Sequence, residues 1–253
     1  MLKMMKGEHV SMKKTGVFLY AVFSYLFAMS GQIAFILYIS PWDLMPWHID
    51  RGTADISFGA VALDLLLIAL FGLQHTLMAR KSIKRKLFGT LPESIERSTY
   101  VWLSGALLWL IILFFQPFEG YLWDLRSSIW GSLLSALFVA AWLFSTVATF
   151  VINHFELFGL QQGWHYLRGV SPKEIPFEVK LFYRVVRHPI QLGVLAGLWA
   201  TPAMGYGHLL LSAGLSIYIL IGLYYEERDL ERHFGDAYRD YKKQVAKLIP
   251  LLY

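Results

Sequence analysis

The chain has 253 residues, of which 56% are hydrophobic and 16% are charged, and its mean hydropathy is +0.47. These values exclude an ordinary soluble globular protein and indicate a polytopic membrane protein. The absence of cysteine excludes disulfides, thiolate zinc sites and a cysteine nucleophile. The formal net charge of +5 would suit a nucleic-acid-binding protein, but the cations gather in loops beside apolar segments.

Four apolar segments follow one another in the first part of the chain. The first, from Val17 to Ile39, would be about 34 Å long as a helix, which is enough to span a bilayer and too long for the apolar part of a signal peptide. Polar loops separate it from the next three. These further predicted spans are Phe58 to Leu77, Tyr100 to Phe115 and Trp130 to Ile152.

Two more apolar segments, 190–204 and 207–225, flank a stretch with several Gly and Pro residues, which favour a turn. Lys and Arg accumulate on the cytoplasmic side of membrane proteins. If the N-terminus is cytoplasmic, a hairpin here puts every Lys and Arg except Arg51 and Arg126 on that side. The sequence therefore predicts six membrane-crossing segments, with a short fifth one, a hairpin formed by the last two, and both termini in the cytoplasm.

The expected fold is an all-α polytopic membrane helix bundle. We expect one integral membrane domain over residues 1–253, because the loops between spans are mostly short. Residues 16–152 would supply the four N-terminal spans, and residues 153–253 a C-terminal part that binds a cofactor. Because membrane orientation explains the positive charge, we expect the lipid bilayer, and no nucleic acid, as a partner.

The tail from Glu227 to Gln244 has apolar residues at helical spacing, which predicts an amphipathic helix or helix pair. Gly235 would break it, and Asp236 would cap the part that follows. We expect this tail to lie on the bilayer surface. Its predicted apolar face comprises Leu230, Phe234, Tyr238 and Tyr241.

The densest group of polar residues lies in 183–193, where the fifth apolar segment begins. Arg187 and His188 precede Pro189, a residue that suits the first turn of a helix. A helix N-terminus offers free N–H groups and a positive dipole end to an anion. The pattern therefore predicts a site for a ligand carboxylate. The alternative is that Arg184 and Arg187 only anchor the segment at the lipid headgroups.

Two carboxylates, Glu226 and Glu227, directly follow the last apolar segment, where a charged group is costly unless it is paired. We expect one of them to face water and the other to reach Arg187 or a ligand hydroxyl or amine. A single carboxylate can accept two hydrogen bonds from a ribose diol.

The remaining polar residues near the spans leave alternatives open. His154 and Glu156 do not have the spacing of paired metal ligands, so no metal is expected. His75, at the cytoplasmic end of the second span, is either satisfied by a neighbouring helix or functional. Asp64 must face protein, and Gln32 is a candidate partner for it.

Several separate motifs carry a family resemblance. The segment 187–193, the pair at 226–227 and the tail 230–241 resemble the C-terminal signature of the integral-membrane methyltransferases related to isoprenylcysteine carboxyl methyltransferase. Gln191 stands where that signature usually has an aromatic residue. Segments 74–80, 95–100 and 153–160 are similar to one branch, the methanethiol S-methyltransferases, and to their NnrU-like relatives.

This resemblance implies S-adenosylmethionine as methyl donor, methanethiol as a small-molecule thiol substrate and dimethyl sulfide as product. It also implies a bacterial inner membrane, with the active site on the cytoplasmic side. Methyl transfer from a sulfonium is an in-line displacement, so the protein has to align donor and acceptor. A base should help, because the thiolate is the better nucleophile and an alkanethiol is mostly neutral at pH 7.

The residues are assigned on this basis. The expected cofactor-binding residues are Arg184, Arg187, His188, Pro189, Gly193, Glu226 and Glu227, and the candidate catalytic bases are His154, His188 and Tyr183. The acceptor pocket is expected to be small, dry and aromatic and to include His75, Asn153, Phe155 and Phe158.

Three alternative functions stay open at this point. The acceptor could be another thiol or a prenylated cysteine. A membrane reductase using NADPH would be favoured if the basic loop 80–86 bound a 2′-phosphate, although the sequence has no Gly-rich dinucleotide fingerprint. A non-enzymatic NnrU-like membrane factor would use its polar groups only for assembly, and cofactor binding separates it from the two enzymes.

Overall fold

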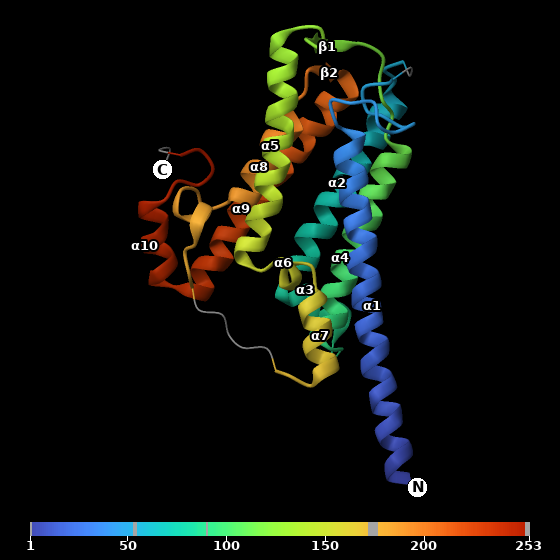
Figure 1. The fold of residues 1–253 in the computed structure, drawn as a ribbon, viewed down its shortest axis with the longest axis vertical. Helices are drawn as coiled ribbons and strands as arrows, with labels where there is room; N and C mark the ends of the chain where they lie inside the picture. The colour runs from blue at the N-terminus through green and yellow to red at the C-terminus, as the bar shows by residue number, and fades with distance from the viewer. Residues whose placement is uncertain (1, 53–54, 90, 172–176, 251–253) are drawn as a thin grey trace.

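The computed structural model describes residues 2–52, 55–89, 91–171 and 177–250, with side chains for all of these except 2–12, 79, 81, 82, 84 and 85. The molecule is a bundle of long helices with a small two-stranded ribbon at one end (Figure 1). The long helices are α1 (Leu2–Tyr38), α2 (Phe58–Ala79), α4 (Glu93–Phe114), α5 (Ile129–Ile152) and α9 (Tyr206–Phe234).

These five helices are the ones, within the described part of the chain, that are long and apolar enough to cross a membrane. The sixth apolar helix, α8 (Pro189–Trp199), has only 11 residues. It is short, as predicted for the fifth segment, and it is not among the helices that are long enough to cross a membrane. Large apolar side chains such as Leu65, Leu137 and Leu143 are exposed on the outside of the bundle. Such a surface suits lipid and confirms the polytopic membrane helix bundle.

Local sequence sets where the long helices begin and end. Ser57 and Ser128 cap α2 and α5, because each side chain accepts a hydrogen bond from a backbone N–H of the first turn. Helix α4 begins at Glu93 rather than at the predicted Tyr100, and its first turn carries acidic residues that suit the positive end of the helix dipole. Helix α9 continues past the apolar segment to Phe234.

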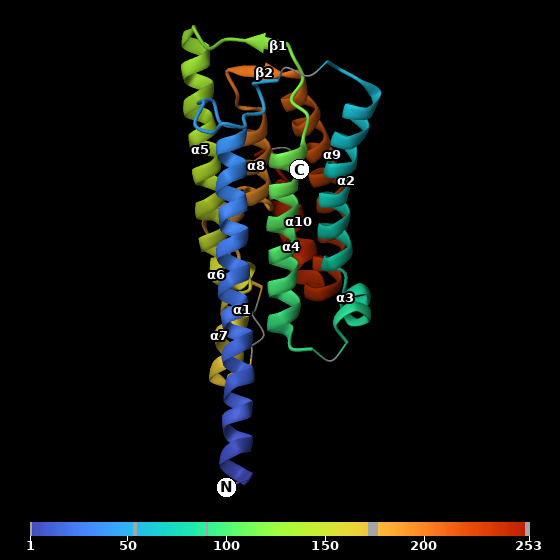
Figure 2. The ribbon, with the colours of Figure 1, turned by 90° about the vertical axis from the view of Figure 1, so that its right-hand side faces the viewer.

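The shorter helices lie outside the long-helix bundle. Helices α3, α6 and α7 lie at the end opposite to the ribbon, where α1 begins, and α10 packs beside the C-terminal part of α9 (Figures 1 and 2). Their bounds are α3 (Lys81–Phe88), α6 (His154–Leu157), α7 (Leu160–Arg168), the 3-10 helix η1 (Leu181–Arg184) and α10 (Asp236–Gln244).

The ribbon pairs β1 (Tyr121–Asp124) with β2 (Ala203–Gly205) in antiparallel register. It is a small addition to the predicted all-α fold. Because β1 lies between α4 and α5, and β2 between α8 and α9, the turn after α8 is at the same end as the loop before α5. This confirms the predicted hairpin of the last two apolar segments.

Two glycines hold α8 tightly against α5. A Cβ atom on Gly193 would lie 2.7 Å from the carbonyl oxygen of Ala141, and one on Gly197 would lie 2.5 Å from Nε1 of Trp142. Small residues four apart let membrane helices approach closely. The position of the short helix α8 is therefore set by its close packing against α5.

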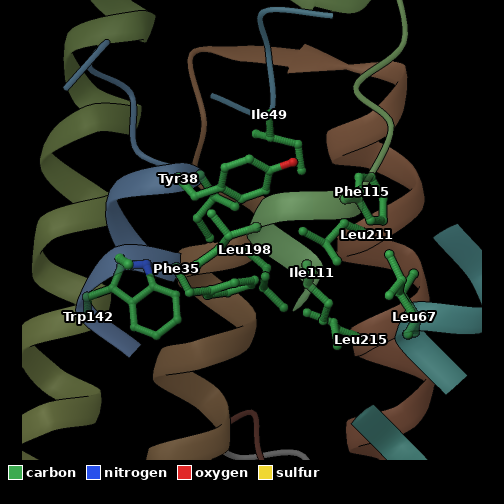
Figure 3. Close-up of a cluster of buried hydrophobic side chains, with 14 of the residues drawn as sticks. Phe35, Tyr38, Ile49, Leu67, Ile111, Phe115, Trp142, Leu198, Leu211 and Leu215 are labelled. Atoms are coloured by element: carbon green, nitrogen blue, oxygen red, sulfur yellow. The ribbon is translucent and has the colours of Figure 1, made fainter. Parts of the chain in front are cut away.

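Buried apolar side chains from α1, α2, α4, α5, α8 and α9 meet toward the ribbon end of the bundle (Figure 3). Some polar groups in this region are paired, as His208 is with the Asp50 carboxylate at 3.0 Å. Among the described residues, the Tyr38 hydroxyl and Asp64 Oδ2 are buried without a hydrogen-bond partner. The buried Asp64 accepts a hydrogen bond from the backbone N–H of Gln116 at 2.8 Å, so the suggested pairing with Gln32 is wrong.

The two cations predicted to lie apart from the others are at the ribbon end. Arg126 follows β1 and pairs with Asp124. Arg51 adjoins Asp50, whose carbonyl accepts a hydrogen bond from the Tyr121 hydroxyl. The structure thus sorts these two cations as the charge pattern predicted, and the assignment of the opposite end to the cytoplasm stays a prediction.

The C-terminal tail packs on the protein. Helix α10 is separated from α9 at Gly235, which has a φ of +59°, as expected for the break. Gly235 itself occupies the capping position, so the predicted cap at Asp236 is wrong. Tyr238 is only 2% exposed and packs with Tyr241 around Phe177. Within the predicted bilayer-facing surface, Tyr238 is therefore covered by the chain and Tyr241 is half-buried.

Candidate functional site

The Arg-His-Pro segment is joined to the C-terminal tail by backbone and side-chain bonds. The backbone N–H groups of Arg187 and His188 donate to the carbonyls of Ala246 and Lys247, at 2.8 and 3.2 Å. Arg187 Nε donates to Glu227 Oε1 at 2.8 Å, and its Nη1 donates to the carbonyls of Lys242, at 3.0 Å, and Val245. We call Arg187, His188 and Glu227, with these tail carbonyls, the C-terminal knot.

The knot is buried and uses its polar groups internally. Arg187, His188 and Glu227 are each less than a tenth exposed. His188 Nε2 lies 3.2 Å from the same carboxylate oxygen that accepts from Arg187. Hydrogen bonds of this kind satisfy buried charges that would otherwise be very costly. The knot therefore positions the tail and the start of α8, and its Nε and Nη1 donors are not free for a ligand.

A cavity of about 1300 Å³ lies between α1, α2, α4, α5, α8 and α9. It is larger than a typical pocket for one small molecule, which has about 300–1000 Å³. Along α9 its lining changes from apolar at Leu215 to polar at Asp229 and His233, over roughly 27 Å of helix. The cavity thus has an apolar interior and a polar mouth, and cations at the mouth include Arg80, Arg97, Arg228 and Arg232.

Glu226 and Glu227 point to different places although they are neighbours, because successive residues of a helix lie about 100° apart. Glu227 belongs to the knot, whereas Glu226 lines the cavity with its side chain 47% exposed. Gln191 Nε2 lies 3.4 Å from Glu226 Oε2, and His188 Nδ1 lies 3.9 Å from it. Gln191, the departure from the family signature, therefore supports the carboxylate that faces the cavity.

Four aromatic rings from three helices form one wall of the cavity. The ring centroid of His75 lies 4.6 Å from that of Phe71, 5.1 Å from Tyr100 and 6.2 Å from Tyr218. Gly72 makes this possible, because a Cβ atom there would lie 2.8 Å from Tyr218 Cδ2. We call Phe71, His75, Tyr100 and Tyr218 the aromatic wall. All four line the cavity.

His154, a predicted base, is outside the cavity lining and has both ring nitrogens occupied. Nδ1 lies 2.8 Å from Thr149 Oγ1 and Nε2 lies 2.9 Å from the Tyr25 hydroxyl. The imidazole stacks on Phe150 with ring centroids 4.2 Å apart. Burial lowers the pKa of His154, which keeps the imidazole neutral. These contacts give His154 a structural position at the end of α5.

Only part of the predicted acceptor pocket lines the cavity. Phe158 does, as does His75. Asn153 instead makes the left-handed turn between α5 and α6, with a φ of 119°, and binds Glu156 with its side chain. Phe155 lies outside the lining and is 48% exposed.

Four further predicted residues also lie outside the cavity lining, so their cofactor or catalytic roles stay predictions. Arg184 is exposed, with Nε 3.4 Å from the carbonyl of Val179. Burial raises the pKa of the Tyr183 phenol. Pro189 is the first residue of α8, and Gly193 packs on α5.

The sequence did not assign Tyr100, Ser104, Tyr218 or Arg97 to the site, yet all of them line the cavity. Arg97 Nε donates to the carbonyl of Leu157 at 2.9 Å, beside Phe158. One pattern could have shown the first two: Tyr100 and Ser104 are four residues apart on α4 and therefore share a face with Arg97. Tyr218 lies within an apolar span and has no such pattern.

Two further predictions concern a metal ion and the 2′-phosphate of NADPH. Among the residues that the structure describes, no group of three or more His, Asp or Glu side chains could hold a metal ion. The basic loop 80–86, considered for a 2′-phosphate, lies largely outside the described side chains. Arg80, which is described, lines the cavity mouth and stacks on Tyr225 at 5.1 Å.

Known proteins similar to this chain cover most of its length. It is 44% identical over 207 residues to the methanethiol S-methyltransferase of Mycobacterium tuberculosis, which spans 82% of this chain and 85% of that protein. It is 42% identical over 208 residues to the methanethiol S-methyltransferase of Pseudomonas deceptionensis, with 82% and 79% covered. It is 27% identical over 234 residues to Nurim of Mus musculus, with 83% and 87% covered.

No protein-family model and no solved structure matches the chain. The relatives named methanethiol S-methyltransferase exceed the similarity that chance or a shared membrane composition would give, and the matches cover 82% of this chain. On this sequence similarity, the chain belongs to the methanethiol S-methyltransferase family.

Proposed function

We propose that this chain is a membrane enzyme that transfers a methyl group from S-adenosylmethionine to methanethiol, giving dimethyl sulfide and S-adenosylhomocysteine. The observation that carries the proposal is the identity of 42–44% along most of the chain to proteins named methanethiol S-methyltransferase. The relatives do not point to a reductase or to a prenylated acceptor.

The polar mouth of the cavity fits the donor. S-adenosylmethionine supplies a methyl group activated by a sulfonium cation. Glu226 is the one carboxylate of the 226–227 pair that reaches the cavity, so we assign it to the ribose hydroxyls or the amine. The cations at the mouth suit the donor carboxylate. Arg187 and His188 act behind them, through the knot that places Glu226.

The aromatic wall fits the sulfonium and the acceptor. Aromatic faces attract cations, and aromatic cages are known to hold onium groups. The apolar part of the cavity, near Phe35 and Leu215, suits a small uncharged thiol. Bringing the two reactants into line is the main task of the protein, since alignment alone can supply up to about 7–11 kcal/mol.

The same cavity supports a single functional unit and an orientation. Its lining comes both from 16–152 and from 153–253, which supports one domain over the whole chain. Its charged mouth lies at the end of α9 away from the ribbon. With that end in the cytoplasm of a bacterial inner membrane, a soluble donor would enter from the cytoplasm.

The test is headspace gas chromatography of the purified protein in detergent, supplied with S-adenosylmethionine and methanethiol. We expect dimethyl sulfide that depends on both reactants, and a strong loss for Glu226→Gln. If the wild type makes none while calorimetry still detects S-adenosylmethionine binding, methanethiol is the wrong acceptor. Absence of binding as well would remove the methyltransferase assignment.

A further inference from the structure

Gln74 has one amide orientation that fits its neighbours. Its Nε2 lies 3.3 Å from the backbone carbonyl of Tyr100, which can only accept a hydrogen bond, so the NH₂ group must be on that side. The amide oxygen Oε1 then faces His75 Nδ1 at 3.1 Å. Ser104 Oγ, which is 2.8 Å from the same carbonyl of Tyr100, lies beside both groups.

This orientation fixes the tautomer of His75. A carbonyl oxygen accepts and never donates, so His75 Nδ1 must carry the proton that is shared with Gln74 Oε1. In a neutral imidazole, Nε2 then carries the lone pair and can take up a proton. No residue that the structure describes forms a hydrogen bond with this nitrogen, and His75 lines the cavity.

None of the other buried imidazoles near the bundle interior combines a free ring nitrogen with a place in the cavity lining. His154 Nε2 is occupied by Tyr25, and His188 Nε2 faces Glu227 in the knot. His208 contacts Asp50 through Nδ1 and the carbonyl of Leu198 through Nε2. Only His75, among these, combines a fixed tautomer with access to the cavity.

We propose that His75 is the general base that removes the proton from the acceptor thiol. This inference rests on the proposed function, which it deepens. His75 Nε2 takes the S–H proton, and a sulfur lone pair forms the new bond to the methyl carbon. The bond between that carbon and the sulfonium sulfur breaks, and its electron pair stays on the sulfur of S-adenosylhomocysteine. The imidazolium returns its proton to water.

The groups around His75 suit this step. Phe71, Tyr100 and Tyr218 surround the ring with aromatic surface, which excludes water from a small apolar thiol. Gln74 acts as a positioning residue, because it presents Nε2 rather than Nδ1 as the base.

The deciding experiment compares two acceptors in His75→Gln. Glutamine keeps a polar side chain of similar reach but cannot take up a proton. With methanethiol we expect kcat to fall about 10²- to 10⁴-fold. Methaneselenol is the second acceptor, because a selenol is more acidic than a thiol and is largely ionised at neutral pH. Because methaneselenol needs no base, His75→Gln should methylate it at a rate close to that of the wild type with the same acceptor.

His165→Gln in α7 is the matched control and should behave as the wild type with both acceptors. Equal loss of both activities in a His75→Gln protein that still binds S-adenosylmethionine would overturn the base role, as would full activity with methanethiol. If the wild type itself makes no dimethyl sulfide, the proposed function fails instead.

Gln74→Met provides a second route if His75→Gln does not fold. It keeps the imidazole but removes the acceptor that fixes its tautomer. We expect it to slow methylation of methanethiol more than that of methaneselenol. An unchanged ratio of the two rates would contradict the inference.

Discussion

The C-terminal knot and the aromatic wall both place an imidazole against α9, but they use it differently. In the knot, His188 and Arg187 converge on a carboxylate that is 7% exposed, and their neighbours are tail carbonyls. In the wall, His75 lies among aromatic rings and opens to the cavity. A dense group of charged residues in a membrane protein can therefore hold the chain together, while the base that we propose is a less conspicuous histidine.

The two regions meet at consecutive residues of α9. Glu227 completes the knot and Glu226 faces the cavity, and His188 lies near both. Substitutions that affect one region and spare the other can therefore separate stability from ligand binding.

The largest effect is expected for Arg187→Met. It would leave Glu227 buried without its closest cation, and breaking a buried ion pair from one side costs about 3–5 kcal/mol. Thermal unfolding in detergent should show a large drop in stability. Arg184→Met, an exposed neighbour, is the control and should change little. Equal unfolding temperatures for Arg187→Met and Arg184→Met would refute the structural role of the knot.

Gly72→Ala should disturb the wall without touching the knot. The added methyl would collide with the Tyr218 ring, and displacement of a positioning group by about 1 Å can cost about 10²-fold in rate. We expect such a loss in kcat/KM for methanethiol, measured as dimethyl sulfide formation. Gly59→Ala, on the same helix with open space around it, should keep wild-type activity. If Gly72→Ala kept wild-type activity, the position of the Tyr218 ring would not matter for the reaction.

Glu226→Gln tests the cavity side of the pair. Hydrogen bonds to a charged group contribute about 1.5–3 kcal/mol, so the Kd for S-adenosylmethionine should rise about 10- to 100-fold while stability stays near that of the wild type. Isothermal calorimetry measures the affinity. Glu119→Gln, near the ribbon, is the control. An unchanged Kd in Glu226→Gln would remove this carboxylate from the donor site.

The smallest effect concerns pH and His154. Burial lowers the pKa of His154 in the folded protein, whereas the unfolded chain takes up this proton near the usual value of about 6.5. The unfolded state therefore binds more protons as the pH falls below about 6.5, and stability falls until the lowered pKa is passed. Unfolding midpoints measured between about pH 7.5 and pH 5 should fall less steeply for His154→Gln. The same dependence of the unfolding midpoint on pH in the wild type and in His154→Gln would contradict a contribution from His154.

The sequence predicted the bundle well because its causes are local or additive. Apolar length placed the long spans, and the distribution of cations chose a hairpin over a single broken helix, with a turn between Thr201 and Gly207. The start of α4 at Glu93 was harder to predict, because the polar residues of its first turns resemble those of a loop. The ribbon could not be foreseen, because β1 and β2 are far apart in sequence and each is very short.

The site was predicted only in part, for a physical reason. Residue type indicates what a group can do, but not whether its hydrogen bonds are already used. Arg187 and His154 are typical ligand-binding residues whose donors and acceptors are satisfied by tail carbonyls and by Tyr25. The sequence predicted different roles for Glu226 and Glu227 without saying which was which, and the helix geometry of α9 directs Glu226 to the cavity and Glu227 to the knot.

The ribbon at the far end also bears on how the protein is made. Strand β1 is synthesised well before β2, so its edge lacks its ribbon partner until the α8–α9 hairpin brings Ala203–Gly205 beside it. Until then it is an open strand edge, of the kind that pairs with other chains. Closure of the ribbon therefore requires that the α8–α9 turn has reached β1, which joins the C-terminal part of the chain to the loop between α4 and α5.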